Sequence, residues 1–126
     1  MMDMKERMNS GELYIDSGYG LPQQRLMGKA RAYEYNHSHP FNQELRNDII
    51  QRMFARVGKE CWIEPPINFA YGTHISIGDN FYANFNLTLV DDAEITIGNN
   101  VMFAPNVTIS TAGHPIHPDL RHTQQQ

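Results

Sequence analysis

The apolar residues of the C-terminal half recur in a pattern that fits neither a helix nor a simple strand. Residues 74–89 nearly repeat as residues 94–109, at a fixed offset of twenty. Within each copy apolar residues recur every six positions, and this spacing extends back to residue 57. A strand face has a period of 2 and a helix face a period of 3.6, so a six-residue step predicts short strands with a corner after each. The three apolar sets are Val57, Ile63 and Phe69; Ile77, Ala83 and Leu89; and Ile97, Phe103 and Ile109.

Three such steps form one triangular coil of about eighteen residues, and two further residues per coil give the offset of twenty. The pattern therefore predicts a mainly β fold of stacked coils whose inward residues form one apolar column. Gly78 and Gly98 each follow an inward isoleucine, where a corner needs a small, permissive residue. Asn80 and Asn100 tolerate left-handed turn conformations. The alternative is a β-sandwich with hairpin turns at these glycines, but three apolar sets in register favour the coils.

The N-terminal half has a helical pattern instead. Apolar residues recur at three- and four-residue steps, and Asn36 to Pro40 interrupts them. We predict helices over residues 2–9, 21–35 and 41–56, with Gly58 ending the last one. The six-residue step begins after that glycine. The chain is thus predicted to have a helical cap module, residues 1–57, and a coil-forming module, residues 58–126.

Composition narrows the function classes. The chain has 126 residues, a net charge of −4 and a pI of about 5.8, which argues against nucleic acid as the main partner. No apolar stretch approaches the ~20 residues that a membrane span needs, and the N-terminus lacks the apolar segment of a signal peptide. Cys61 is the single cysteine, so no intrachain disulfide can form, and we expect it to be a semi-buried residue beside Trp62. We predict a cytoplasmic protein.

The coil pattern stops before the chain does. The last apolar set ends at Ile109, and the next would begin near residue 117, where the sequence is HPDLRHTQQQ. A solenoid needs a cap with a polar outer face. We therefore expect the β-helix to be C-terminally incomplete, so that either a partner covers it or the chain is part of a longer protein.

Several polar residues on and after the coils could carry chemistry. His114 lies between Gly113 and Pro115, and a histidine fixed in this way is a candidate general base near neutral pH. A surface histidine without a role is the alternative. His114 and His117 could also suggest a metal-dependent hydrolase, but no third ligand is evident, so we expect no metal. The other polar candidates are Tyr82, Asn84, Asp91, Asp92 and Asn106; of these, the Asp91-Asp92 pair is expected in a solvated turn.

Taken together, the chain resembles the galactoside and maltose O-acetyltransferases of the hexapeptide-repeat, left-handed β-helix superfamily. The resemblance covers nearly the whole chain and is specific at several separated places. The stretches that carry it are residues 8–14 (MNSGELY), residues 26–38 up to YNHS, residues 77–86 (IGDNFYANFN), residues 97–100 with 104–107 (IGNN and APNV), and residues 111–116 (TAGHPI).

The resemblance implies transfer of an acetyl group from acetyl-CoA to a sugar hydroxyl. His114 matches the family's general base, and no residue is assigned to acetyl-CoA binding. The residues that match the acceptor pocket are Asp16, Arg25, Tyr82, Asn84 and Asp92. Family members form homotrimers with active sites between subunits, so the resemblance also implies that arrangement here.

The chain departs from the family pattern at two places. Position 70 is alanine, where galactoside enzymes carry a serine that touches the sugar. The family also continues for several coils that supply most of the coenzyme A groove and an oxyanion N–H. We therefore expect the isolated chain to be weakly active or inactive. The alternative function is a non-catalytic β-helix fragment that binds sugar or mediates subunit assembly.

Overall fold

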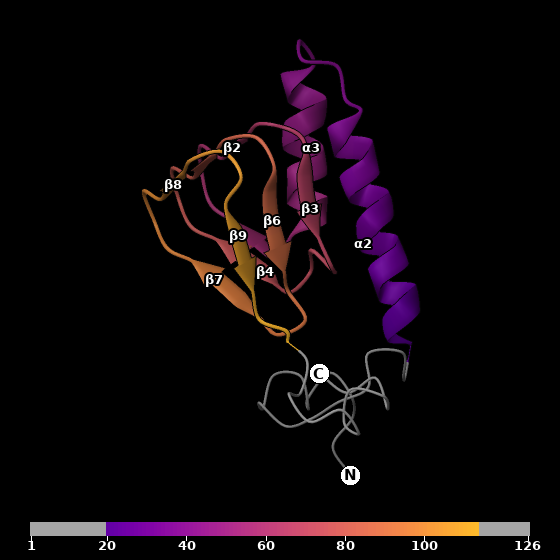
Figure 1. The fold of residues 1–126 in the computed structure, drawn as a ribbon. Helices are drawn as coiled ribbons and strands as arrows, with labels where there is room; N and C mark the ends of the chain where they lie inside the picture. The colour runs from indigo at the N-terminus through magenta and orange to yellow at the C-terminus, as the bar shows by residue number, and fades with distance from the viewer. Residues whose placement is uncertain (1–19, 114–126) are drawn as a thin grey trace, which may run out of the picture.

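A computed structural model of the chain describes residues 20–113 (Figure 1). Two helices, α2 (Leu21–Asn36) and α3 (Gln43–Met53), precede nine short strands. The predicted helix over residues 2–9 lies outside the described residues, and the helix predicted over residues 21–35 is confirmed as α2. No helix among residues 20–113 is both long enough and apolar enough to cross a membrane.

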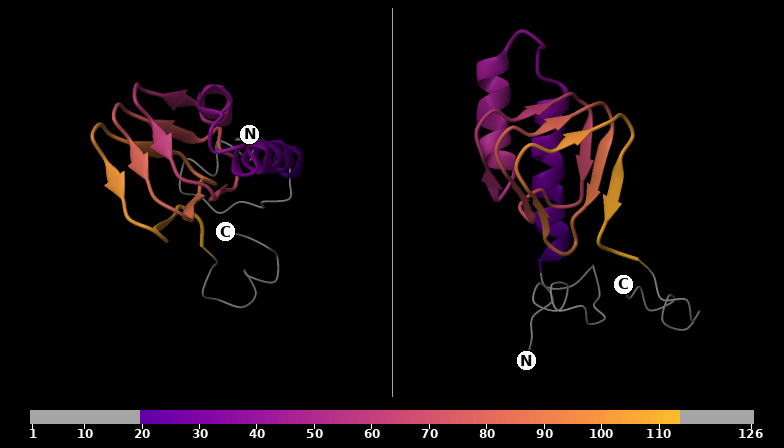
Figure 2. Two further views of the ribbon diagram at one scale, coloured as in Figure 1. Left: turned by 90° about the horizontal axis from the view of Figure 1, so that it is seen from above. Right: turned by 90° about the vertical axis from the view of Figure 1, so that its left-hand side faces the viewer.

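The strands build three parallel sheets, each with one strand from every coil. The first sheet has the order β1-β4-β7, the second β2-β5-β8 and the third β3-β6-β9. Figure 2 shows the coils following one another away from α3, from magenta to orange. The strands are β1 (Arg56–Val57), β2 (Trp62–Ile63), β3 (Ile67–Phe69), β4 (Ile75–Ile77), β5 (Tyr82–Ala83), β6 (Leu87–Val90), β7 (Ile95–Ile97), β8 (Met102–Phe103) and β9 (Thr108–Ser110).

Every strand pair keeps the offset of twenty that the sequence repeat predicts. Val57 pairs with Ile77 and Ile77 with Ile97, and the other two sheets keep the same register. The predicted apolar column is therefore confirmed. β1 already belongs to the coils, although it precedes residue 58; the division into modules at that residue stays a prediction.

The core is wider than the six-residue step predicts. On longer strands a second side chain, two residues earlier, also points inward, since side chains on one face of a strand recur every two residues. Ile67, Ile75 and Leu87 are of this kind, and all three are buried. Each longer strand thus contributes two apolar layers to the coil interior.

Asparagine takes the left-handed corner positions. Asn80, Asn86, Asn100 and Asn106 have φ angles from 57° to 63°, which confirms the prediction for Asn80 and Asn100. Asn80 Nδ2 donates to Asn100 Oδ1 at 2.9 Å, and Asn86 Nδ2 donates to Asn106 Oδ1 at 3.2 Å. Equivalent corners of neighbouring coils are therefore joined by side-chain hydrogen bonds.

The glycine before the corner is needed for space and not for a left-handed backbone. A Cβ at Gly78 would collide with Asn99 Oδ1 and would lie 2.8 Å from the carbonyl carbon of Gly98. Asp79 N donates to the same Asn99 Oδ1 at 2.7 Å, which brings the two corners together. Gly98 meets nothing within 4 Å among the described atoms. The expected small residue is thus confirmed at residue 78, and the left-handed step falls on Asn80, as predicted.

α2 packs along β3 of the third sheet, and polar contacts fix it to the first coil. Asn36 donates to the carbonyl of Ile67 and accepts from its N–H, both at 2.9 Å. Tyr35 is buried, and its hydroxyl donates to the carbonyl of Ile63 at 2.6 Å. In Figure 1 α2 and α3 lie side by side, with β3 beside them.

α3 is shorter than the predicted helix over residues 41–56. Asn42 is the N-cap, and its side chain accepts from the N–H of Leu45 at 3.2 Å. At the other end Phe54 is extended, and the N–H of Ala55 donates to the carbonyl of Ile75 at 2.9 Å. Strand pairing therefore ends the helix before Gly58.

Candidate functional site

One corner of the coils gathers several of the predicted site residues. Three turns from successive coils stack there: residues 70–72, residues 91–93 and residues 111–113. We call this set the acidic corner, after Asp91 and Asp92. It lies between the third sheet and the next coil, and α2 reaches it through Arg25.

The Asp91 side chain binds the turn of residues 70–72, in the preceding coil, by accepting hydrogen bonds from its backbone N–H groups. Its Oδ1 accepts from the N–H groups of Ala70 at 2.9 Å and Tyr71 at 2.8 Å, and its Oδ2 accepts from Gly72 at 2.8 Å. Asp91 is fully buried. A buried carboxylate must be compensated by charge-assisted hydrogen bonds, and these three N–H donors supply them.

The expected solvated turn at Asp91-Asp92 is wrong. Asp91 has an exposed fraction of 0% and Asp92 of 6%. Two adjacent aspartates are common in solvated turns, but here the turn of the preceding coil binds the Asp91 carboxylate through its N–H groups. Asp92 is therefore a buried acidic side chain.

The acidic corner also contains the first residues of the segment that leads to His114. The N–H of Ala93 donates to Thr111 Oγ1 at 2.9 Å, and Thr111 Oγ1 donates to the carbonyl of Val90 at 2.8 Å. Thr111 begins the segment that leads to His114. The structure therefore places the start of that segment directly against the turn that contains Asp92.

Arg25 reaches the acidic corner from the first turns of α2. Its Nη1 donates to the Tyr71 hydroxyl at 2.9 Å, and its Cζ lies 5.7 Å from the centre of the Tyr71 ring. The Tyr71 ring stacks on His74, with 4.3 Å between the ring centres. The Nδ1 of buried His74 lies 2.7 Å from the carbonyl oxygen of Asp91.

Tyr82 and Asn84 lie elsewhere on the same coil. Tyr82 is in β5 and Asn84 follows it, so both project outward while Ala83 points inward. Strand β6, four residues long, separates them from Asp92, which at about 3.3 Å per residue is roughly 13 Å. One chain thus brings Arg25 and Asp92 to one corner and leaves Tyr82 and Asn84 at another.

Other predicted residues fall outside residues 20–113. Asp16, His114 and His117 are among them, so their positions stay predictions. Within the described range, no group of three or more His, Cys, Asp or Glu side chains is arranged to hold a metal ion.

Sequence reasoning missed Tyr71 and the buried role of Asp91. The repeat itself held the signal, because the offset of twenty places residue 91 beneath residue 71. A corner carboxylate beneath a turn of free N–H groups is a natural acceptor for them. The dipeptide Asp91-Asp92 was instead interpreted from its local composition.

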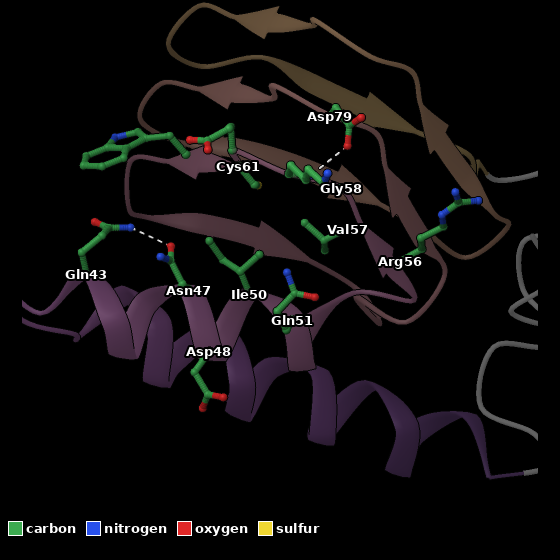
Figure 3. Close-up of a pocket in the computed structure, with 13 residues that line it drawn as sticks. Gln43, Asn47, Asp48, Ile50, Gln51, Arg56, Val57, Gly58, Cys61 and Asp79 are labelled. Carbon is green, nitrogen blue, oxygen red and sulfur yellow. Dashed lines mark hydrogen bonds between the residues drawn. The ribbon is translucent and has the colours of Figure 1, made fainter.

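A groove of about 900 Å³ lies between α3 and the first coil (Figure 3). The amide side chains of Gln43, Asn47 and Gln51 line it from the helix, and residues from Arg56 to Trp62 line it from the coil. Gln43 Nε2 donates to Asn47 Oδ1 at 2.9 Å, as the figure shows. Arg25, Tyr82, Asn84 and Asp92 do not line this groove, so it is separate from both groups of predicted site residues.

Cys61, on the wall of this groove, is a free thiol, and burial raises its pKa to about 11. Burial disfavours the thiolate, which is the form that alkylating reagents attack. We therefore expect iodoacetamide to modify Cys61 slowly at pH 8, with a rate that rises until about pH 11. The same chain unfolded in urea should react much faster at pH 8, because an exposed thiol has a pKa of about 8.5. Equal rates for the folded and unfolded chains would contradict the prediction.

Comparison with known proteins gives consistent matches. The family described as the maltose acetyltransferase hexapeptide capping motif matches residues 7–58. The galactoside O-acetyltransferase of Escherichia coli (strain K12) is 57% identical over 120 residues, which cover 95% of this chain and 59% of that protein. Nodulation protein L of Rhizobium meliloti (strain 1021) is 34% identical over 122 residues, which cover 97% of this chain and 67% of that protein.

A solved structure matches equally well. A galactoside acetyltransferase in complex with coenzyme A superposes with a TM-score of 0.95 at 54% sequence identity, covering 99% of this chain and 62% of that one. This match confirms the predicted fold class, a left-handed parallel β-helix of hexapeptide-repeat coils behind N-terminal helices. The chain spans less than two thirds of the length of the E. coli relative and of this structure.

Proposed function

The chain belongs to the galactoside and maltose O-acetyltransferase family, and on this basis we propose that it transfers an acetyl group from acetyl-CoA to a sugar hydroxyl. The observation that carries the proposal is the superposition of nearly the whole chain on an acetyltransferase that binds coenzyme A, at more than half sequence identity. The acceptor, galactoside or maltose in type, is a proposal of the same kind.

The proposed reaction needs one proton transfer at the acceptor. The acceptor hydroxyl attacks the thioester carbonyl carbon, the carbon–sulfur bond breaks, and the hydroxyl proton passes through His114 to the leaving thiolate. A positioned histidine suits this role because its ordinary pKa, about 6.5, allows both uptake and release near neutral pH. Thr111, where the segment leading to His114 begins, is hydrogen-bonded to the turn that contains Asp92. This contact supports a single site that includes both His114 and Asp92.

The acceptor-binding groups fit a hydroxyl-rich ligand. Asp92 is a buried carboxylate that offers acceptors, Arg25 is a half-buried donor, and Asn84 offers both. A site built from such groups discriminates sharply against ligands that lack the matching hydroxyls. Asp16 and Tyr82 complete the proposed pocket.

We propose that the active chain is a homotrimer whose sites are completed between subunits. The supporting observation is that Asn84 and Asp92 lie at opposite ends of β6 in one chain. A neighbouring chain would bring the Asn84 end of one coil towards the acidic corner of another. Light scattering should give three times the 14.5 kDa chain mass. Mixing inactive Asn84→Ala and Asp92→Ala chains should restore part of the activity, whereas no recovery would count against shared sites.

The compartment that we propose is the cytoplasm. The free thiol of Cys61 fits a reducing environment, where disulfides are rare.

The test of the function is release of coenzyme A in the presence of acceptor. The purified protein is incubated with acetyl-CoA and, separately, thiogalactoside, maltose or glucose. We expect slow acceptor-dependent release with at least one of them, since the chain spans less than two thirds of the length of the E. coli relative and of the solved structure, and mass spectrometry should find the acetylated sugar. Sugar binding without any coenzyme A release or acetyl-CoA binding would favour a non-catalytic role in its place.

A further inference from the structure

We propose that Tyr71 and Asp91 are positioning residues for Arg25, and that they hold its guanidinium in the orientation with which it contacts the sugar acceptor. The inference rests on the proposed function, because it takes Arg25 as an acceptor-binding residue. It adds two residues that touch no substrate in this scheme and act through Arg25.

The direct contact is between Arg25 and the Tyr71 ring. Arg25 Nη1 donates to the Tyr71 hydroxyl at 2.9 Å, and the guanidinium carbon lies 5.7 Å from the ring centre. A long arginine side chain has several rotamers, and a fixed hydrogen-bond partner reduces that freedom before the ligand binds. Tyr71 therefore lowers the entropy that Arg25 would lose on binding an acceptor.

Tyr71 can do this because it is itself immobile. It is fully buried, and its ring stacks on that of buried His74 at 4.3 Å between centres. Its backbone N–H donates to Asp91 Oδ1 at 2.8 Å. Both its ring and its backbone are thus held.

Asp91 holds the whole turn and not Tyr71 alone. Its carboxylate accepts from three successive N–H groups, those of residues 70–72. Its carbonyl oxygen lies 2.7 Å from Nδ1 of His74, the residue on which Tyr71 stacks. Asp91 also directly precedes Asp92, so the same residue sets the relative positions of two proposed acceptor-binding groups, Arg25 and Asp92.

The helix side of the contact is equally constrained. Gly28, one turn after Arg25, is buried, and a Cβ there would collide with the carbonyl oxygen of Tyr71. α2 therefore touches the turn at the level of its backbone. Residues three apart lie on the same helix face, so this close approach points Arg25 at the Tyr71 hydroxyl.

The test is Tyr71→Phe, which removes the hydroxyl and keeps the ring. We expect KM for the acceptor to rise about two- to tenfold, the cost of ordering one long side chain on binding, about 0.5–1.5 kcal/mol. KM for acetyl-CoA and kcat should stay within about twofold, because neither depends on the orientation of Arg25. In the Arg25→Ala background the same change should have almost no further effect on the acceptor KM.

Tyr35→Phe is the matched control. It also removes a tyrosine hydroxyl, that of Tyr35 in α2, which donates to the Ile63 carbonyl at 2.6 Å. Tyr35 has no hydrogen bond to Arg25 among those described. The control change should lower the melting temperature by several degrees, about 4–8 °C, without raising the acceptor KM. A readout that needs no turnover is proton exchange at the Arg25 guanidinium by NMR, which should be faster in Tyr71→Phe than in the parent or in Tyr35→Phe.

The outcomes separate the inference from the function on which it rests. An active protein with a raised acceptor KM in Arg25→Ala but an unchanged one in Tyr71→Phe would overturn the positioning role alone. An unchanged acceptor KM in Arg25→Ala would remove Arg25 from the site and the inference with it. A parent that neither binds nor acetylates any acceptor would overturn the proposed function as well.

Discussion

His114→Ala is expected to lower kcat for acetyl transfer by about 10²–10⁴-fold, the usual contribution of a positioned general base. Without the imidazole, the acceptor hydroxyl must attack while it still carries its proton. The melting temperature of the variant shows whether the fold is retained. We expect the melting temperature and the acceptor KM to change little, and the measurement is coenzyme A release at saturating acceptor.

His117→Ala is the matched control, because it removes a second histidine from the same segment. It should retain nearly full turnover, and so should the parent after dialysis against a metal chelator, since a metal-dependent hydrolase would need both histidines. The pH profile gives an independent check. kcat/KM should fall as pH drops below about 6.5, where an ordinary histidine becomes protonated and cannot accept a proton. If His114→Ala turned over as fast as the parent, the base would have to be another residue.

The coils could be predicted from the sequence because their stacking repeats a single constraint. Each inward position must be apolar in every coil. The matching isoleucines Ile77 and Ile97 therefore predict the strand register that the structure shows. The corner asparagines follow from the same repeat. The end of α3 could not be predicted, because the apolar spacing of the helix continues through Phe54 while strand pairing from Ala55 ends the helix first.

The candidate site, too, could be predicted from the sequence only in part. Its residue types carried the resemblance, and the structure brings Arg25 to the corner of Asp92. The burial of Asp91 could not be read from its neighbours, since Asp-Asp occurs equally in solvated turns. What distinguishes it is the turn of residues 70–72 from the coil above, a contact made across twenty residues of sequence. Asp91 is buried because backbone N–H groups of another coil need an acceptor there, and local turn propensity does not determine its burial.

Asp91→Ala is therefore expected to lower the free energy of unfolding by about 3–5 kcal/mol, an unusually large effect for one side chain. The change leaves the buried N–H groups of Tyr71 and Gly72, and the part-buried N–H of Ala70, without their acceptor. Each buried donor left unsatisfied costs about 1–3 kcal/mol. Asp91→Asn should give an intermediate loss, because its amide keeps one oxygen but turns an NH₂ group towards another N–H. Urea unfolding followed by circular dichroism measures all three proteins.

Asp79→Ala provides the comparison that isolates burial. Asp79 occupies a corner of the same coil, and its Oδ1 also accepts from a backbone N–H, that of Lys59 at 2.8 Å, but the pair is exposed. Water can replace that carboxylate, so its removal should cost about 1 kcal/mol or less. If Asp79→Ala and Asp91→Ala destabilised the protein equally, burial of the acceptor would not be the cause. A loss confined to Asp91 would show that one carboxylate beneath three N–H groups joins the first two coils at the corner on which Arg25 depends.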